Sequence, residues 1–190
     1  MKSLIALMLA LAAGSAAAAE VAGVKVDDKV ALQPGGQELV LNGAGLRTRA
    51  IFKVYVAGLY LSEKKASAAD AIAAPGPKRV SMTMLRDLKT EDLVKALNEG
   101  MEKNNPAAEM AKLKPQVGEL TQIMNSLGEA KKGDVIALDF LPDGGTRVLV
   151  NGEPKGKPIA GADFYKALLR VWLGDNPVED SLKKAMLGQP

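Results

Sequence analysis

The strongest constraint on the fold is a run of β-branched and aromatic residues at 47–61, RTRAIFKVYVAGLYL. These residue types, in this alternation of polar and apolar side chains, favour a strand over a helix. The run follows NGAG at 42–45, whose glycines accept backbone conformations that other residues resist. The sequence therefore predicts a tight turn before Leu46, followed by one long strand that begins at about Arg47.

One face of this strand would carry most of the polar groups that suit ligand binding. Side chains alternate between the two faces of a strand, so five residues would share one face if no bulge intervenes: Arg47, Arg49, Ile51, Lys53 and Tyr55. The opposite face would carry Phe52, Val54 and Val56. Guanidinium, ammonium and phenol groups at a spacing of ~7 Å suit a carboxylate, but they are also ordinary on a solvated sheet face. The pattern alone leaves both interpretations open.

Residues 1–19 have the three parts of a secretory signal peptide, which are a positive start, an apolar run and a small-residue end. The apolar run is too short to span a bilayer of roughly 30 Å, so we expect cleavage after Ala19 and no stable membrane anchor. The remaining residues, 20–190, have the size of a single domain. These features predict a periplasmic or secreted protein.

The sequence contains no histidine and no cysteine. This excludes nucleophile systems that depend on histidine or cysteine, ordinary zinc or copper sites, and disulfides. No glycine-rich phosphate loop is present. The formal net charge is +3, and acidic and basic residues are interspersed along the chain. We therefore predict no metal, no cofactor and no nucleic-acid partner, and any catalysis would depend on Arg, Lys, Tyr, Asp, Glu, Ser or Thr.

The rest of the chain alternates between strand and helix patterns, which predicts an α+β domain. Strands are expected on both sides of a PGGQ turn at 34–37 and at 78–85, 134–141, 146–150 and 155–159. Helices are expected at 62–74, 90–104, 106–127, 163–173 and 178–187, with a break or kink at Pro115. Arg86 and Asp87 are expected to form a salt bridge at a strand end.

A cleft between sheet and helices is the natural ligand site of such a domain. Its apolar lining is expected from flexible thioethers and leucines: Met82, Met84, Leu93, Leu97 and Met101. The alternative is that these side chains fill the core. Arg47, Lys53 and Tyr55 would form the polar end of the cleft only if their strand face looks toward the helices.

Four segments together resemble one known family, occur in its order, and cover nearly all of residues 20–190. They are GAGLRTRAIFKVYVAGLYL, KRVSMTMLRD, DFLPDGGTRVLVNG and GADFYKALLRVWLGDNPVEDSLKKAMLG. They look like the bacterial chalcone isomerase-like proteins. The resemblance implies the chalcone isomerase fold, an open-faced β-sandwich in which a large curved antiparallel sheet is backed by helices, with a ligand cleft between them.

This family includes plant enzymes that cyclise chalcones, plastid fatty-acid-binding proteins, and members without known catalysis. The resemblance gives Arg47 the place of the arginine that polarises the substrate in the enzymes and holds the carboxylate in the binders. Tyr55 stands where the enzymes carry threonine and where the fatty-acid binders carry tyrosine. The enzymes also carry a tyrosine and an asparagine on the next helix, where this chain has Leu93 and Glu99, with Asn98 close by.

Three hypotheses follow from these matches and departures. The first is a periplasmic, non-catalytic binding protein for a fatty acid or similar apolar carboxylate, whose head group is held by Arg47 and Tyr55. The second is an intramolecular lyase or isomerase acting on a phenolic substrate, with Arg47 at the oxyanion and Tyr55 or Lys53 as acid or base. The third is a module without a small ligand. The sequence leaves the oligomeric state open.

Overall fold

The computed structural model of the chain describes residues 19–33 and 35–190. The predicted signal peptide lies outside this part except for Ala19, and so does Pro34 of the predicted PGGQ turn. Within the described residues the strands of the main sheet are β3 (Lys29–Leu32), β4 (Gln37–Arg49), β5 (Phe52–Leu61), β6 (Lys78–Met84), β9 (Val135–Leu141), β10 (Gly145–Val150) and β11 (Glu153–Ile159). Every neighbouring pair is antiparallel, in the order β11-β10-β9-β6-β5-β4-β3.

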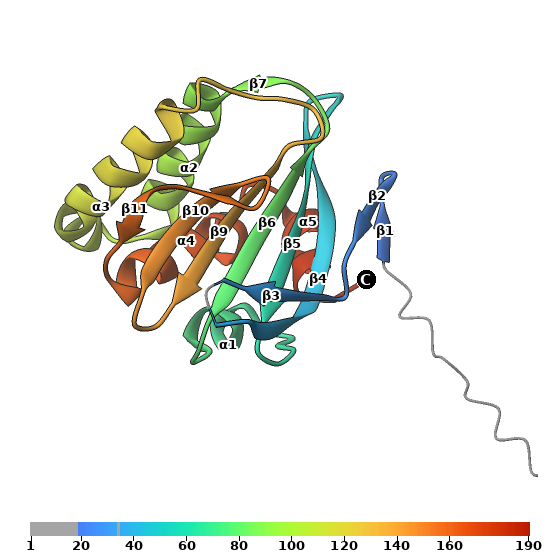
Figure 1. Cartoon of the computed structure of the whole chain (residues 1–190), viewed down its shortest axis with the longest axis horizontal. Coiled ribbons are helices and arrows are strands. Elements are labelled where there is room, and N and C mark those ends of the chain that lie inside the picture. Colours follow the sequence, from blue (N-terminus) through green and yellow to red (C-terminus); the bar gives the residue numbers. More distant parts are fainter. Residues whose placement is uncertain (1–18, 34) are drawn as a thin grey trace, which may run out of the picture.

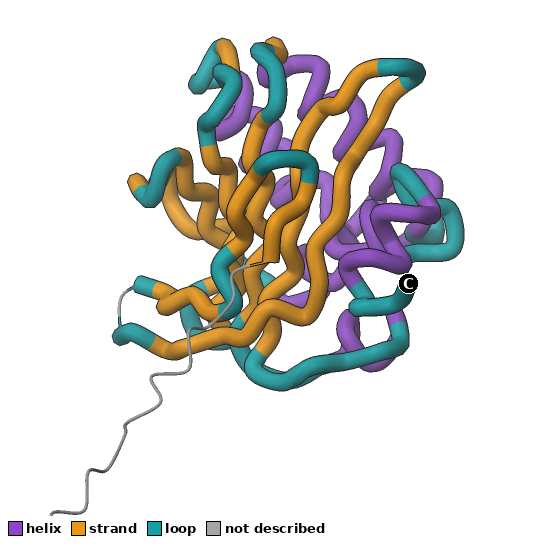
Figure 2. Tube along the Cα trace, turned by 90° about the vertical axis from the view of Figure 1, so that its right-hand side faces the viewer, coloured by secondary structure: helices purple, strands orange, loops and turns teal. Residues whose placement is uncertain are grey.

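The helices gather on one face of this curved sheet (Figures 1 and 2). They are α1 (Ala68–Ala73), α2 (Thr90–Asn104), α3 (Ala107–Asn125), α4 (Ala162–Leu173) and α5 (Asp180–Met186). Two small two-stranded sheets complete the described chain. One is the hairpin of β1 (Ala19–Val21) with β2 (Val24–Val26), and the other pairs β7 (Leu88–Lys89) with β8 (Glu129–Ala130) across α2 and α3. The predicted α+β architecture, a large curved antiparallel sheet backed by helices, is confirmed.

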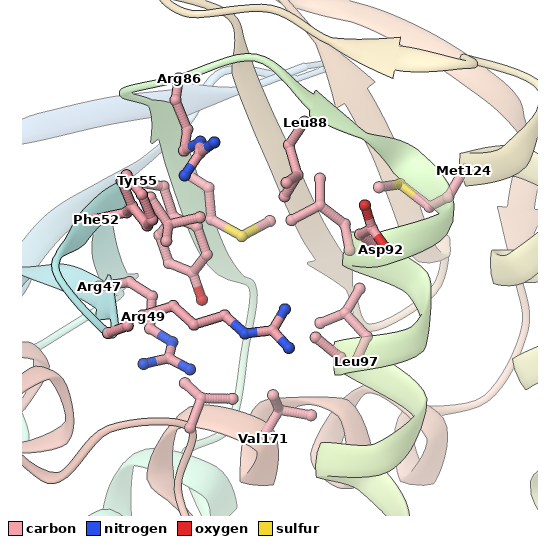
Figure 3. A pocket seen from close by; sticks show the side chains of 16 residues that line it. Arg47, Arg49, Phe52, Tyr55, Arg86, Leu88, Asp92, Leu97, Met124 and Val171 are labelled. Carbon is pink, nitrogen blue, oxygen red and sulfur yellow. The ribbon is translucent and has the colours of Figure 1, made fainter.

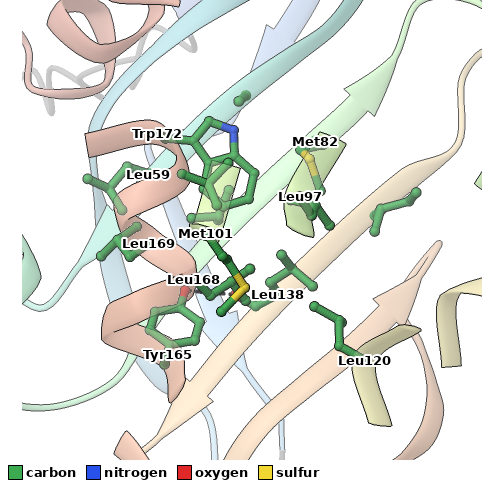
Figure 4. Close-up of a cluster of buried hydrophobic side chains, with 14 of the residues drawn as sticks. Leu59, Met82, Leu97, Met101, Leu120, Leu138, Tyr165, Leu168, Leu169 and Trp172 are labelled. Atoms are coloured by element: carbon green, nitrogen blue, oxygen red, sulfur yellow. Dashed lines mark hydrogen bonds between the residues drawn. The ribbon is translucent and has the colours of Figure 1, made fainter. Parts of the chain in front are cut away.

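The main core lies between the sheet and α4, whose apolar residues surround most of the helix (Figure 4). Phe164 and Trp172 are almost completely buried, and burying each such side chain contributes about 1.5–3 kcal/mol or more. Tyr165 packs against Phe140 and donates a hydrogen bond from its hydroxyl to the Leu138 carbonyl oxygen of β9 at 2.9 Å. Helix α4 is thereby fixed across the middle of the sheet.

A smaller apolar cluster lies on the opposite face of the sheet. It joins the β1–β2 hairpin to β3, β4 and β5 through buried side chains, which are Val26, Leu32, Leu39, Leu41, Val56 and Tyr60. Farther along this face, the buried Asp139 of β9 accepts hydrogen bonds from Nε and Nη2 of Arg79 on β6, at 2.5 and 2.6 Å.

The central hairpin differs from the prediction. The chain turns at Ala50 and Ile51, where Ala50 has a φ of 54°, and not before Leu46. The segment that was expected to be one strand from Arg47 onward is therefore split between the end of β4 and the whole of β5.

The glycines expected to form a turn instead lie inside β4, because α5 packs directly against them. A Cβ at Gly43 would lie 2.1 Å from the Ala185 carbonyl oxygen, and one at Gly45 would lie 2.6 Å from the Ala185 Cβ. Glycine is required here for the close approach of a helix and not for backbone freedom.

Two local features also differ from the prediction. Helix α3 is continuous through Pro115, so the helix is not broken there. Arg86 and Asp87 form no salt bridge with each other, because their side chains have different partners. The Arg86 guanidinium lies over the Phe52 ring, 4.6 Å from its centroid, whereas the Asp87 carboxylate accepts a hydrogen bond from the Lys132 backbone N–H at 2.7 Å.

Candidate functional site

A cavity of about 350 Å³ lies between the β4–β5 hairpin, β6 and the helices α2 and α4 (Figure 3). This volume lies at the lower end of the range for small-molecule sites. Most of its lining is apolar: Ala50, Phe52, Val54, Met82, Leu88, Leu93, Ala96, Leu97, Met124, Val171 and Val178. The polar lining consists of Arg47, Arg49, Tyr55, Arg86 and Asp92. The cavity is therefore mostly apolar, with basic side chains on one side.

The strand pairing brings Arg47 and Tyr55 together at this site. Arg47 of β4 lies directly opposite Tyr55 of β5, and both side chains face the helices. Figure 3 shows the Tyr55 hydroxyl pointing toward the side of the cavity where Arg47 and Arg49 lie. Three residues of the strand face that the sequence suggested for a carboxylate, Arg47, Arg49 and Tyr55, therefore line the cleft.

A β-bulge at Val54 separates Lys53 from the other predicted site residues. Arg47 pairs with Tyr55 but Thr48 pairs with Lys53, so Val54 is the extra residue on β5. The bulge breaks the simple alternation, and both Val54 and Tyr55 line the cavity. Lys53 is exposed and lies outside the cavity lining, whereas Phe52, expected on the opposite face, lines it.

Arg47 is held by a carboxylate that sequence reasoning missed. Its Nη1 donates to the Oε2 of Glu179, just before α5, at 3.0 Å, and also to the Thr48 carbonyl oxygen. Glu179 accepts further hydrogen bonds from the Thr48 backbone N–H at 2.7 Å, the Thr48 hydroxyl at 2.8 Å and the Ser181 hydroxyl at 3.0 Å. Burial alone would raise the pKa of Glu179, but these donors outweigh it and lower the pKa.

Tyr55 is only 6% exposed, and its hydroxyl oxygen accepts a hydrogen bond from the Trp172 indole N–H of α4 at 3.1 Å. Burial raises the pKa of Tyr55, although the Trp172 hydrogen bond and the Arg47 guanidinium act in the opposite direction. The hydroxyl therefore stays protonated at neutral pH. Because Trp172 occupies an acceptor position, the hydroxyl proton can be donated to a group inside the cavity.

The predicted apolar lining is divided between the cavity and the core. Met82, Leu93 and Leu97 line the cavity. Met84 and Met101 are buried outside its lining and fill the core, as the alternative interpretation held. The contribution of Val178, after α4, was missed because it comes from a distant part of the sequence.

A second hollow of about 300 Å³ adjoins the cavity and shares with it Arg47, Arg49, Asp92, Ala96 and Val178. Its remaining lining residues come from α2 and the segment after α4: Lys95, Glu99, Gly100, Lys103, Asn176 and Pro177. Four of its lining side chains are basic and two are acidic. The two hollows together thus present an apolar space next to a polar, cationic one.

Two kinds of feature are absent from residues 19–33 and 35–190. No group of three or more acidic side chains is placed to hold a metal ion. No helix of these residues is long and apolar enough to cross a membrane.

The comparisons with known proteins agree with this architecture. The sequence profile described as chalcone isomerase-like matches residues 18–188. No curated protein matches the sequence. Among solved structures, the chain is similar to a fatty-acid binding protein of Arabidopsis thaliana, with a TM-score of 0.61 and 15% identity over 84% of this chain and 95% of that one. At this identity the likeness shows the fold, so the predicted chalcone isomerase fold is confirmed.

Proposed function

Because the chain belongs to the chalcone isomerase-like family, we propose that it is a non-catalytic binding protein for a fatty acid or a similar apolar carboxylate. One observation carries this proposal: Arg47 and Tyr55 lie opposite each other at the polar side of an otherwise apolar cavity between the sheet and the helices. The similarity in fold to a fatty-acid binding protein supports the same function.

The polar side of the cavity has the donors that a carboxylate requires. A guanidinium has five N–H donors, so Arg47 retains donors for a ligand while Nη1 contacts Glu179. Arg49 also lines the cavity and has no ion-pair partner in the described part of the chain. The Tyr55 hydroxyl would add a neutral donor, and charge-assisted bonds from guanidinium to carboxylate are among the stronger hydrogen bonds in proteins.

The apolar side of the cavity would hold the tail. Its walls are formed by Met82 of β6, Leu93 and Leu97 of α2, and Val171 of α4. These side chains carry no polar group, so a hydrocarbon tail that packs against them removes no hydrogen bond to water. The ligand would lie with its head at the β4 side and its chain between the sheet and α2.

The cavity is poorly equipped for the alternative function, an intramolecular lyase or isomerase on a phenolic substrate. Lys53, one candidate acid or base, lies outside the cavity lining. Burial raises the pKa of Tyr55, which disfavours the phenolate that a general base requires. Asn98, near the position of an asparagine in the enzymes, donates to the Thr121 hydroxyl at 3.4 Å and does not line the cavity.

We place this binding protein in the periplasm or outside the cell. The support is the N-terminal sequence, in which a positive residue, an apolar run and a small-residue end occur in the order of a signal peptide. Detection of a mature N-terminus at residue 20 in the exported fraction would test this location, and retention of residues 1–19 in the cytoplasm would contradict it.

Native mass spectrometry of the purified protein, followed by titration with fatty acids of increasing length, tests the function. Arg47→Ala and Tyr55→Phe should each weaken binding by about 1.5–3 kcal/mol, or roughly 10- to 150-fold in Kd, because each removes a donor to the head group. Lys53→Ala is the matched control and should bind as the unchanged protein does, since Lys53 lies outside the cavity lining.

Three outcomes would contradict the proposal. Equal affinity in Arg47→Ala, Tyr55→Phe and the unchanged protein would place the site elsewhere. If no acid binds and a chalcone instead loses its absorbance in a reaction that Arg47→Ala abolishes, the protein is an isomerase. If no fatty acid binds and the chalcone keeps its absorbance, the chain is a module without a small ligand.

A further inference from the structure

The tip of the β4–β5 hairpin carries the large apolar side chains that are exposed in the described part of the chain. Ile51 is 88% exposed and Phe52 is 52% exposed. The hairpin stands at one end of the sheet, where the tip joins β4 to β5 (Figure 1). Scattered surface apolar residues need no explanation, but two adjacent large ones at a protruding tip indicate contact with an apolar partner.

Three exposed cations adjoin this apolar tip: Arg49 and Lys53 flank it in the chain, and the Arg86 guanidinium lies over the Phe52 ring. None of them has a salt-bridge partner among residues 19–33 and 35–190. The carboxylate of Asp87, the acid next to Arg86, is bound by the Lys132 backbone N–H. Another acid, Asp92, lines the cavity on the α2 side. The tip therefore combines two exposed apolar side chains with three adjoining basic ones.

We propose that the β4–β5 tip, defined as residues 49–53 together with Arg86, docks onto the surface of a bilayer that contains anionic phospholipids. Apolar side chains that enter the headgroup boundary and cations that meet anionic lipids are the two features that interfacial binding combines. A protein partner fits less well, because a stable protein interface buries about 800 Å² on each side and the tip offers two apolar side chains.

The tip also forms part of the wall of the ligand cavity. Arg49, Ala50, Phe52 and Arg86 belong to the tip and line the cavity at the same time. A tip seated in the headgroup region would bring the cavity close to a source of acyl chains. This consequence rests on the proposed fatty-acid binding, whereas the docking itself rests on the tip alone.

Two tip residues allow the docking to be tested apart from the ligand site, because Ile51 and Lys53 lie outside the cavity lining. Protein purified without the predicted signal peptide is floated with vesicles of phosphatidylcholine alone or of equal parts phosphatidylcholine and phosphatidylglycerol. The unchanged protein should bind the mixed vesicles and not the neutral ones. Ile51→Ser should weaken that binding by about tenfold or more, and Lys53→Gln by about fivefold.

The matched control is Lys64→Gln, which removes an equal charge beyond the opposite end of β5 and should leave vesicle binding unchanged. All three variants should keep the fatty-acid affinity of the unchanged protein in solution. Vesicle binding that Ile51→Ser leaves intact, or no binding to mixed vesicles at all, would overturn the docking. A concentration-dependent dimer that Ile51→Ser abolishes, without vesicle binding, would also overturn it and assign the tip to self-association.

The two proposals fail in different ways. Vesicle binding without any fatty-acid binding would leave the docking standing and remove the proposed function. Fatty-acid binding without vesicle binding would do the reverse.

Discussion

At the scale of single residues, the site depends on how charges are divided around Arg47. Three guanidiniums line the cavity, from Arg47, Arg49 and Arg86, together with the carboxylate of Asp92. Glu179 adds a second carboxylate by pairing with Arg47. The set therefore carries one positive charge in excess, which a single ligand carboxylate would neutralise. This balance suits one monovalent anion better than a dianion or a neutral ligand.

Glu179 also makes a pH-dependent contribution to stability, which Glu179→Gln should remove. The pKa of Glu179 is lower in the folded protein than its ordinary value of 4.5, so its contribution is present above about pH 4.5 and lost as the pH falls through the folded pKa. The variant should lose about 1–3 kcal/mol of unfolding free energy near neutral pH, the range for a hydrogen-bonded charged group. Urea denaturation at a series of pH values checks this.

The difference in unfolding free energy between the two proteins should shrink as the pH falls below about 4.5. A constant difference at every pH would mean that Glu179 keeps an ordinary pKa when folded. Arg47 remains present in the variant, so any change in fatty-acid affinity can be measured separately on the same samples.

At the scale of elements, the contact between β4 and α5 positions the polar side of the cavity. Gly43 and Gly45 let α5 approach the strand. The neighbouring Asn42 donates a hydrogen bond from its side-chain amide to the Met186 carbonyl oxygen at 2.8 Å. Glu179 lies at the start of the same helix and reaches Arg47. The glycines of the strand thus act on the site through a helix more than 130 residues later in the chain.

Gly43→Ala tests this arrangement. The added Cβ would meet the Ala185 carbonyl oxygen at 2.1 Å, a backbone atom, so α5 has to shift. Overpacking of this kind costs about 1–3 kcal/mol of unfolding free energy, measured by urea denaturation. The displaced Glu179 should also weaken fatty-acid binding.

The matched control for that variant is Gly118→Ala in α3, where an added Cβ meets no atom within 4 Å. This change should stabilise the protein by about 0.5–1 kcal/mol, because alanine favours a helix. If Gly43→Ala were as stable as the unchanged protein, the close approach of α5 would not hold in solution.

The sequence predicted the elements better than it predicted their junctions. The meander at β9, β10 and β11 and the helices α2 and α4 lie close to where periodicity and turn residues indicated them. The hairpin was misplaced because glycine serves equally in a turn and in a close contact, and the contacting α5 is far away in sequence. Neither the bulge at Val54 nor the pairing of Glu179 with Arg47 has a local sequence signal, since both depend on partners across the fold.

At the scale of the whole molecule, the space between sheet and helices has a filled half and a hollow half. Trp172, Met84 and Met101 fill the core beside the cavity, and the Trp172 indole reaches the Tyr55 hydroxyl at the boundary. The hollow half is lined in part by residues of the β4–β5 tip, namely Arg49, Ala50 and Phe52. A ligand would therefore complete the packing between two layers, and its binding should be coupled to the stability of the whole domain.

This coupling gives a prediction for thermal unfolding. A ligand that binds only the folded state, at a free concentration of 100 times its Kd, adds about 2.7 kcal/mol. For a domain of this length that corresponds to a rise in Tm of about 5–10 °C, measured by circular dichroism with and without a fatty acid. Arg47→Ala should show a smaller rise at the same acid concentration, because its affinity is lower, whereas Lys53→Ala should show the full rise. An equal rise in all three proteins would mean that the acid binds outside the cavity, so the stabilisation would not report on the packing between sheet and helices.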